Sequence, residues 1–161
     1  MVLGDAHCLP VKSSAVDIVL SIAMLEHVWD PFLTLREVCR VLRPGGLLVG
    51  TVAFLEPHHS SSYFHLSHMA VAEVLRRAHL EVIDIAADAN WTVLEAHFKS
   101  SLFPGLPNSI KRAIMYPLRA AHLSWWAARG LLDPRFSSTE RLKLTAAAFR
   151  FVASKPEGYR C

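Results

Sequence analysis

The stretch that decides the fold is VDIVLSIAMLEHVWDPFLTLREVCRVLRPGGLLVGTV, residues 16–52. It opens with an apolar run at 17–23, passes a polar turn at Glu26-His27, and closes with a second apolar run at 47–52. Between the two runs, apolar side chains recur at helical spacing over 31–42. The order strand, helix, strand predicts a right-handed βαβ unit. Because both strands are nearly continuous apolar runs, we expect a parallel sheet covered on both faces.

The ends of the central helix carry their own signals. Asp30 is typical of an N-cap, and Pro31 suits the first helical position because its missing N–H would have no partner there. At the other end, Pro44 stops the helix, and Gly45-Gly46 predict a turn into the second strand.

The remaining core elements follow a loop at 53–63, which is rich in His and Ser. Ser67 predicts an N-cap for a helix that runs to about Ala78. Residues 80–85 alternate like a half-buried strand, and 146–154 have the pattern of a last strand.

Residues 91–143 do not follow the core pattern and form an expected helical insertion or lid. Prolines are expected to break it into pieces, at Pro104, Pro107 and Pro117. Within it, 110–132 is helical in character and carries two adjacent tryptophans with basic neighbours. This segment predicts either a peripheral membrane contact or a helix packed on the core.

Composition limits the function classes. The chain has 161 residues, 52% of them hydrophobic and 19% charged, which favours one compact globular domain. The net charge of +3 comes from dispersed residues, so we expect no nucleic-acid partner. Three cysteines without metal-type spacing, no secretory leader and no long apolar run predict a cytoplasmic protein.

A set of short motifs resembles the C-terminal half of a class I S-adenosylmethionine-dependent methyltransferase of the broad small-molecule group. The motifs are Gly4-Asp5-Ala6, Leu25-Glu26-His27-Val28, Asp30-Pro31 and Arg40-Val41-Leu42-Arg43-Pro44-Gly45-Gly46. The resemblance implies an α/β fold, with a Rossmann-like doubly wound sheet whose last strand is antiparallel to the others. It also implies S-adenosylmethionine as cofactor and methyl transfer to a small acceptor, which an apolar lid would make apolar or lipid-like.

The family's N-terminal strands and glycine-rich cofactor turn are not found in this sequence. None of the seven glycines gives a G-x-G-x-x-G turn between a strand and a helix. Residues 2–5 read as the end of a strand, so we expect a truncated piece with exposed apolar sheet edges. The expected parts are a partial core at 1–90, the insertion at 91–143, and a last strand with a tail at 144–161.

The resemblance assigns roles to four residues, and the residue type adds a fifth candidate. Asp5 would accept a hydrogen bond from the adenine amino group, and the backbone of Ala6 would meet the ring. Ser21 and Ile22 would present backbone groups to the amino acid portion of the cofactor. His27 lies at the rim of the expected pocket and is the candidate general base, since its unperturbed pKa lies near neutrality.

A metal site and a second function also need consideration. Four histidines follow the second strand, at His58, His59, His65 and His68. Their spacing matches no metal-binding pattern, so no metal site is expected. The second hypothesis for function is a non-catalytic interaction or scaffold fragment that completes its sheet with a partner chain.

Overall fold

The computed structural model describes residues 3–89 and 91–159 and divides into two compact units. The first, here called the sheet unit, contains the chain up to residue 54, residues 59–86 and the chain from residue 149. The second, the helical unit, contains residues 55–58 and 87–148. Each unit is described by itself.

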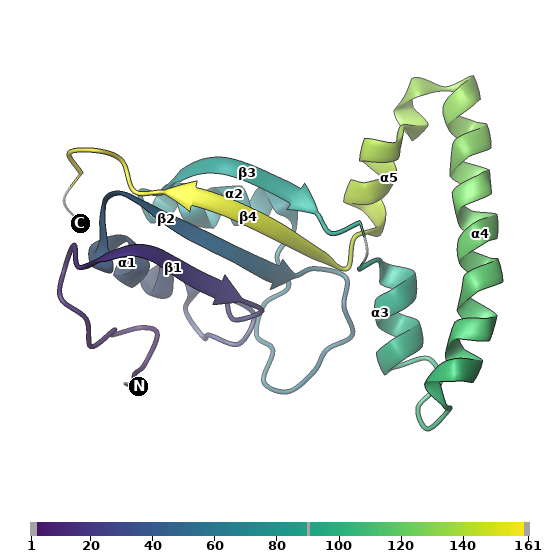
Figure 1. Cartoon of the computed structure of the whole chain (residues 1–161), viewed down its shortest axis with the longest axis horizontal. Helices are drawn as coiled ribbons and strands as arrows, with labels where there is room; N and C mark the ends of the chain where they lie inside the picture. The colour runs from purple at the N-terminus through teal and green to yellow at the C-terminus, as the bar shows by residue number, and fades with distance from the viewer. Residues whose placement is uncertain (1–2, 90, 160–161) are drawn as a thin grey trace. The chain divides into compact units, whose positions relative to one another are not determined.

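The sheet unit holds four strands, β1 (Val16–Ile22), β2 (Leu42–Ala53), β3 (Glu81–Ala87) and β4 (Ala148–Ser154). Their order across the sheet is β1-β2-β4-β3, and β1 pairs with β2 in parallel. In Figure 1 the arrow of β4 runs opposite to those of its neighbours. The antiparallel last strand implied by the family resemblance is therefore confirmed.

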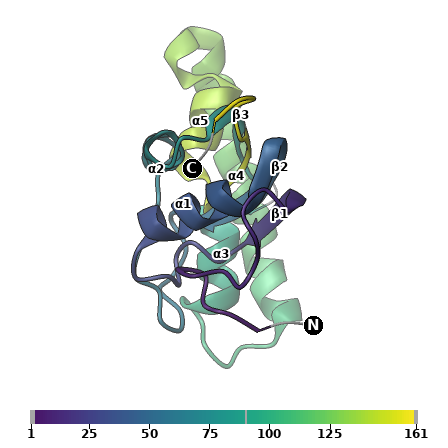
Figure 2. The ribbon, with the colours of Figure 1, turned by 90° about the vertical axis from the view of Figure 1, so that its left-hand side faces the viewer.

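Helices α1 (Pro31–Val41) and α2 (His68–Arg77) lie together on one face of this sheet (Figures 1 and 2). Both predicted caps are present, because Asp30 Oδ1 accepts from the backbone N–H of Leu33 at 2.9 Å and Ser67 Oγ from that of Ala70 at 3.3 Å. Apolar side chains of α1, α2, β2 and β4 form the core, among them Leu35, Val38, Cys39, Leu48, Val71, Leu75, Phe149 and Phe151.

The end of α2 lies close to the predicted Ala78, which is its C-cap. The next residue, His79, adopts the left-handed conformation with φ of 59°. Its ring stacks on Tyr159, with centroids 4.8 Å apart. Since a non-glycine residue pays a steric cost in this region, the ring contact helps to offset that cost.

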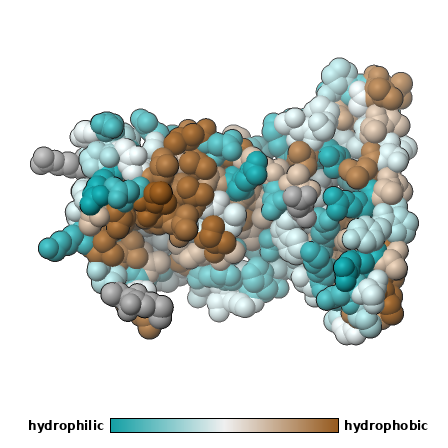
Figure 3. Space-filling view, viewed as in Figure 1, coloured by the Kyte–Doolittle hydropathy of each residue, from teal (hydrophilic) through white to brown (hydrophobic). Residues whose placement is uncertain are grey.

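The expectation that both βαβ strands are covered on both faces is wrong for β1. Its outward side chains Ile18, Leu20 and Ile22 are 58%, 69% and 61% exposed. The reason is that α1 and α2 cover only the opposite face of the sheet, and β1 is in addition an edge strand with a neighbour on one side only. Figure 3 shows apolar side chains gathered where β1 lies. The predicted apolar sheet edge is therefore present at β1.

Three other expectations for the sheet unit need correction. β2 begins at Leu42, earlier than the predicted start at 47, but its pairing with β1 jumps from Leu42 to Leu47 and Gly45 has a φ of 74°, so the predicted turn is present as an irregularity within the strand. Leu3 and Gly4 form no strand, and Asp5 makes only an isolated bridge to Cys8; the other residues of the predicted strand end lie outside the described residues. β3 is not half-buried by alternation, because it forms the other sheet edge and exposes both Val82 and Ile83.

The helical unit consists of α3 (Val93–Ser100), α4 (Asn108–Leu132), the short 3-10 helix η1 (Pro134–Phe136) and α5 (Ser138–Thr145). Pro117 was expected to break the segment, but it lies inside the 25-residue α4. Its missing donor costs one helical hydrogen bond, which the packing of α4 against α3, η1 and α5 offsets. In the described part of the chain, no helix has the length and apolarity needed to cross a membrane.

Candidate functional site

Asp5 is anchored by a small network at the start of α1. The backbone N–H and the ring Nδ1 of His7 both lie within hydrogen-bond distance of Asp5 Oδ1, at 2.9 and 2.7 Å. His7 Nε2 accepts from the backbone N–H of Asp30 at 3.3 Å, so Nδ1 carries the ring proton and donates to Asp5. Hydrogen bonds from the His7 backbone and then its ring hold the pKa of Asp5 below its usual range. The Asp5 carboxylate is therefore an ionised, oriented acceptor.

The segment that follows is clamped to α1 by one ion pair. Glu37 accepts from the backbone N–H of Leu9 at 2.9 Å and pairs with Arg40 at 2.8 Å. The Arg40 guanidinium also donates to the carbonyls of Leu9 and Val11. This clamp lowers the pKa of Glu37, chiefly through Arg40, and fixes the course of the segment next to Asp5.

Ser21 and Ile22 lie at the carboxyl end of β1, where open α/β sheets bind ligands. Ser21 is buried, and its Oγ has no hydrogen-bond partner among the described residues. It pairs in register with Gly50 on β2, and a Cβ at Gly50 would lie 2.6 Å from the Ser21 carbonyl oxygen. Ala23 then turns the chain in the left-handed region with φ of 47°, and its N–H donates to Thr51.

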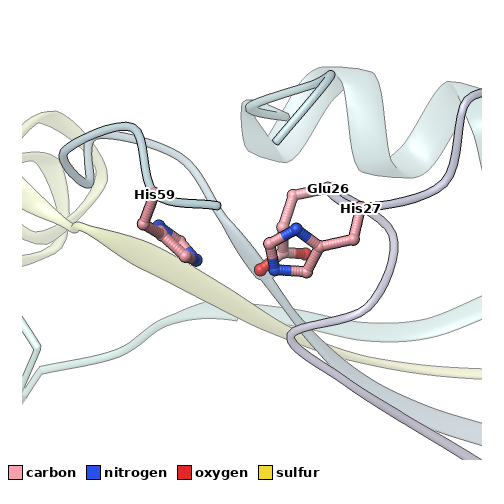
Figure 4. A group of neighbouring side chains, drawn as sticks. All are labelled: Glu26, His27 and His59. Atoms are coloured by element: carbon pink, nitrogen blue, oxygen red, sulfur yellow. The ribbon is translucent and has the colours of Figure 1, made fainter. Parts of the chain in front are cut away.

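The turn after β1 brings Glu26 and His27 next to the loop that follows β2. Glu26 is 1% exposed, and its Oε2 has no partner among the described residues. His27 is partly exposed, and its Nδ1 lies 3.4 Å from the Ser61 carbonyl oxygen. The His27 ring meets His59 edge-on, with centroids 5.2 Å apart. In Figure 4 the three side chains point toward one another.

The predicted residues thus fall into three local settings. Asp5 and Ala6 are supported from the start of α1, Ser21 and Ile22 from β2, and His27 from the loop after β2. Sequence reasoning did not single out His7, and it considered His59 only as one of four loop histidines and did not connect it with His27. The pair Asp5-x-His7 gave a short-range signal, whereas nothing in the sequence links His59 to a histidine 32 positions earlier.

The helical unit contains a cavity of about 520 Å³ between α3 and α4. Four of its lining residues are basic, and each of them has a partner. Lys111 donates to the Lys99 carbonyl at 2.9 Å, Arg112 to that of Asn108, Arg119 pairs with the buried Glu95, and Lys99 lies over the Trp91 ring.

A second cavity of about 260 Å³ is lined by apolar side chains of α3 and α4 and by polar or charged side chains that include His122, Arg119 and Arg141. Burial, with a contribution from the positive charge of Arg141, lowers the pKa of His122. Both cavities have a charged rim, so the helical unit is not uniformly apolar.

The sequence is similar to those of known methyltransferases. Residues 1–50 match the model of a methyltransferase domain family. A probable S-adenosylmethionine-dependent methyltransferase of Mycolicibacterium smegmatis is 30% identical over 163 aligned residues, which cover 92% of this chain and 58% of the relative. A second such protein, from Mycobacterium tuberculosis, is 44% identical over 41 residues, covering 26% of this chain and 15% of the relative. The chain thus spans less than two thirds of these relatives.

Solved structures extend the similarity over almost the whole chain. A putative methyltransferase bound to the Trm112 activator of Haloferax volcanii has a TM-score of 0.59 and 21% identity, covering 97% of this chain and 61% of that one. Geranyl diphosphate C-methyltransferase of Streptomyces coelicolor has a TM-score of 0.56 and 15% identity, covering 95% and 51%. The cyclase SpnF has a TM-score of 0.55 and 23% identity, covering 96% and 55%.

At these identities the solved structures establish the fold, and the cyclase among them shows that the fold alone does not fix the reaction. The sequence matches supply the relationship to methyltransferases, and the Mycolicibacterium relative is described as probably S-adenosylmethionine-dependent. The geranyl diphosphate enzyme was solved with S-adenosyl-L-homocysteine bound. The chain is related to the S-adenosylmethionine-dependent methyltransferases and carries part of their class I fold.

Proposed function

We propose that this chain supplies the C-terminal part of an S-adenosylmethionine-dependent methyltransferase that acts on a small acceptor. The observation that carries the proposal is the 30% identity to the mycobacterial relative over 92% of the chain. The sequence lacks the glycine-rich turn that holds the methionine end of the cofactor in this family. The complete reaction therefore needs that turn from elsewhere, in a longer protein or a partner chain.

In this proposal Asp5 and Ala6 bind the adenine. Asp5 suits the role because both of its contacts to His7 use Oδ1, and the side chain is largely exposed. Oδ2 is then available to accept from an adenine amino group. Ser21 and Ile22 offer their backbone to the amino acid portion from the end of β1, a position that the Gly50 contact fixes.

His27 is the proposed proton acceptor for an acceptor hydroxyl. With Nδ1 protonated and directed at the Ser61 carbonyl, Nε2 keeps its lone pair. The proton taken by Nε2 would be the one released when an acceptor oxygen attacks the activated methyl group. The methyl group passes from sulfur to oxygen, and S-adenosylhomocysteine leaves as a neutral thioether.

For the acceptor, we propose a small molecule with an apolar body, bound by the helical unit. The smaller cavity supports this choice, since Val93, Leu94, Leu118 and Leu123 line it. The polar rim formed by His122 and Arg141 favours an acceptor that also carries an oxygen or an acidic group. Contact of α4 with a membrane surface stays a proposal, supported by the exposed Trp125.

The experiment is a calorimetric titration of the whole chain with S-adenosylhomocysteine. Saturable binding is expected, and Asp5→Asn should weaken it by about tenfold or more, because a charged acceptor is lost. Asp17→Asn is the matched control, since Asp17 is also exposed but pairs with Arg43 at the start of β1. An equal loss in both variants would refute the assignment of Asp5, and absence of saturable binding would show that this chain does not form the cofactor site without the missing turn.

A second candidate function is a non-catalytic fragment that completes its sheet with a partner chain. The exposed apolar row of Ile18, Leu20 and Ile22 favours it, because an edge strand of this kind is a template for pairing. Size measurement by light scattering separates the candidates. A stable stoichiometric oligomer without cofactor binding supports the fragment, whereas a monomer that binds S-adenosylhomocysteine supports the enzyme.

A further inference from the structure

We infer that Glu26, His27 and His59 form a binding site for a divalent transition-metal ion. Glu26 and His27 come from the turn after β1, and His59 comes from the loop after β2 (Figure 4). One ligand atom of each residue lies within 4.8 Å of the other two. All three residues belong to the sheet unit. The histidine spacing alone predicts no metal, because the three ligands meet only in the folded chain.

The buried carboxylate of Glu26 is the first argument. The residue is 1% exposed, and Oε2 has no hydrogen-bond partner among the described residues. A carboxylate oxygen that leaves water without a partner costs free energy, and native proteins nearly always pair such groups. A cation between Glu26 and the two imidazoles would supply both the charge and the missing contact.

The orientation of His27 is the second argument. Its Nδ1 faces the Ser61 carbonyl oxygen at 3.4 Å, a contact in which the ring N–H donates. Histidines that bind metals commonly donate their second ring N–H to a backbone carbonyl, which fixes the tautomer and leaves the other nitrogen for the ion. The His59 ring stands at 79° to that of His27, so the two rings meet edge to face and are not stacked.

The backbone holds the two halves of the site together. The Glu26 carbonyl accepts from the backbone N–H of Tyr63 at 2.7 Å, and Phe64 N–H approaches the same oxygen at 3.4 Å. The loop that carries His59 is therefore tied to the turn that carries Glu26. Ser60, next to His59, adopts the left-handed conformation with φ of 49°. Non-glycine residues in this region often occur where a site constrains the backbone.

The ligand set selects the class of ion. Two imidazoles and one carboxylate suit Zn²⁺, Fe²⁺, Co²⁺ or Ni²⁺ better than Mg²⁺ or Ca²⁺, which prefer oxygen ligands. Ligand atoms around a tetrahedral Zn²⁺ lie about 3.4 Å apart, given metal–nitrogen distances near 2.1 Å. The spread of 4.8 Å must therefore shrink on binding, which requires the exposed His59 side chain to move toward Glu26 and His27.

Three protein ligands leave coordination positions open for water or another molecule, as in catalytic metal sites. An ion on His27 Nε2 would also occupy the lone pair that the proposed function uses for proton transfer. The two roles of His27 are therefore exclusive. Metal binding does not depend on methyl transfer, so the inference stands or falls separately from the cofactor assignment.

The test is a titration of the tag-free, chelator-treated whole chain with Co²⁺, read by visible absorption, and with Zn²⁺, read by calorimetry. Binding of one ion per chain is expected, with the absorption of a coordinated Co²⁺. His59→Ala should weaken binding by at least about tenfold, a loss that even second-layer residues of metal sites can cause. His58→Ala is the control, because His58 is an equally exposed histidine one position away.

A thermal melt adds a second readout. Zn²⁺ should raise the melting temperature of the wild-type chain, because an ion that binds only the folded state stabilises it. Glu26→Gln keeps the shape of the side chain but should lose this rise. The inference is overturned if the wild-type chain binds neither ion, if His58→Ala loses as much affinity as His59→Ala, or if Glu26→Gln keeps the full rise. Failure to bind S-adenosylhomocysteine would count against the proposed function alone.

Discussion

β1 and β4 are both seven-residue strands of one sheet, and both are rich in apolar residues. β4 lies between β2 and β3, and its Phe149 and Phe151 are buried. β1 lies at the edge and exposes three large apolar side chains. The difference teaches that an apolar strand sequence indicates side chains that must be buried against something. The position of the strand in the sheet decides whether other parts of this chain bury them.

The largest expected effect concerns β4, the buried strand of the pair. Phe151→Ala should lower the free energy of unfolding by about 3–5 kcal/mol, because it removes a buried ring and leaves a cavity beside Gly50. Urea unfolding followed by circular dichroism measures the change. A loss below about 1 kcal/mol would mean that the centre of the sheet is loosely packed.

Lys155 offers a second test, at the end of β4. It is 2% exposed, and its Nζ donates to the carbonyl oxygens of Cys39 and Leu42 at 2.8 and 2.9 Å. Lys155→Met should cost about 1–3 kcal/mol, because both carbonyls at the end of α1 lose their donor.

The pH dependence of this variant sharpens the test. Burial lowers the pKa of Lys155 from its usual 10.5. Between the lowered value and 10.5 the unfolded chain holds more protons on this amine than the folded chain, so rising pH favours folding in that window. The wild-type chain should show this contribution and Lys155→Met should not. Equal slopes in urea unfolding across alkaline pH would contradict the assignment.

Glu37 gives a smaller effect, on the helix that covers the sheet. Glu37→Gln should cost about 1 kcal/mol at neutral pH, because the paired side chains are only partly exposed and the clamp on Leu9 weakens. The pKa of Glu37 is below its usual 4.5, so the contribution is present above that value and is lost as pH falls. Urea unfolding at pH 7 and at pH 3 should show a smaller difference in unfolding free energy between Glu37→Gln and wild type at pH 3. The exposed Glu73 pair serves as a comparison with a smaller expected cost.

The smallest effect tests the edge itself. Leu20→Ala should change the free energy of unfolding of the chain alone by no more than about 0.5 kcal/mol, because the side chain is already in water. The same change should reduce self-association in light scattering, because it shortens the apolar row. A large stability loss would show instead that a second copy or a partner covers β1, and the contrast with β4 would disappear.

Much of the fold follows from local sequence signals. The caps Asp30 and Ser67 are confirmed because a side chain and its backbone neighbours decide these features within a few residues. The exposure of β1 and the continuity of α4 through Pro117 depend on neighbours that are distant in sequence, so local patterns mispredict both.

The candidate site shows the same division. Asp5 was predicted through the family resemblance, and its partner His7 lies two positions away. The contact of His27 with His59 joins two loops that only the pairing of β1 with β2 brings together. No rule based on periodicity or residue spacing predicts such a contact. Residue pairs of this kind are where a structure adds chemistry that the sequence does not reveal.

The strand order β1-β2-β4-β3 also bears on how the chain is made. A ribosome releases β3 before β4, yet β4 separates β3 from β2 in the finished sheet. The nascent chain therefore cannot complete its sheet in the order of synthesis, because the space beside β2 must stay open until residues 148–154 emerge. Until then β2 and β3 each expose the unpaired backbone groups of one edge. During this interval the nascent chain is most open to chaperone binding, to proteolysis and to pairing with strands of other chains.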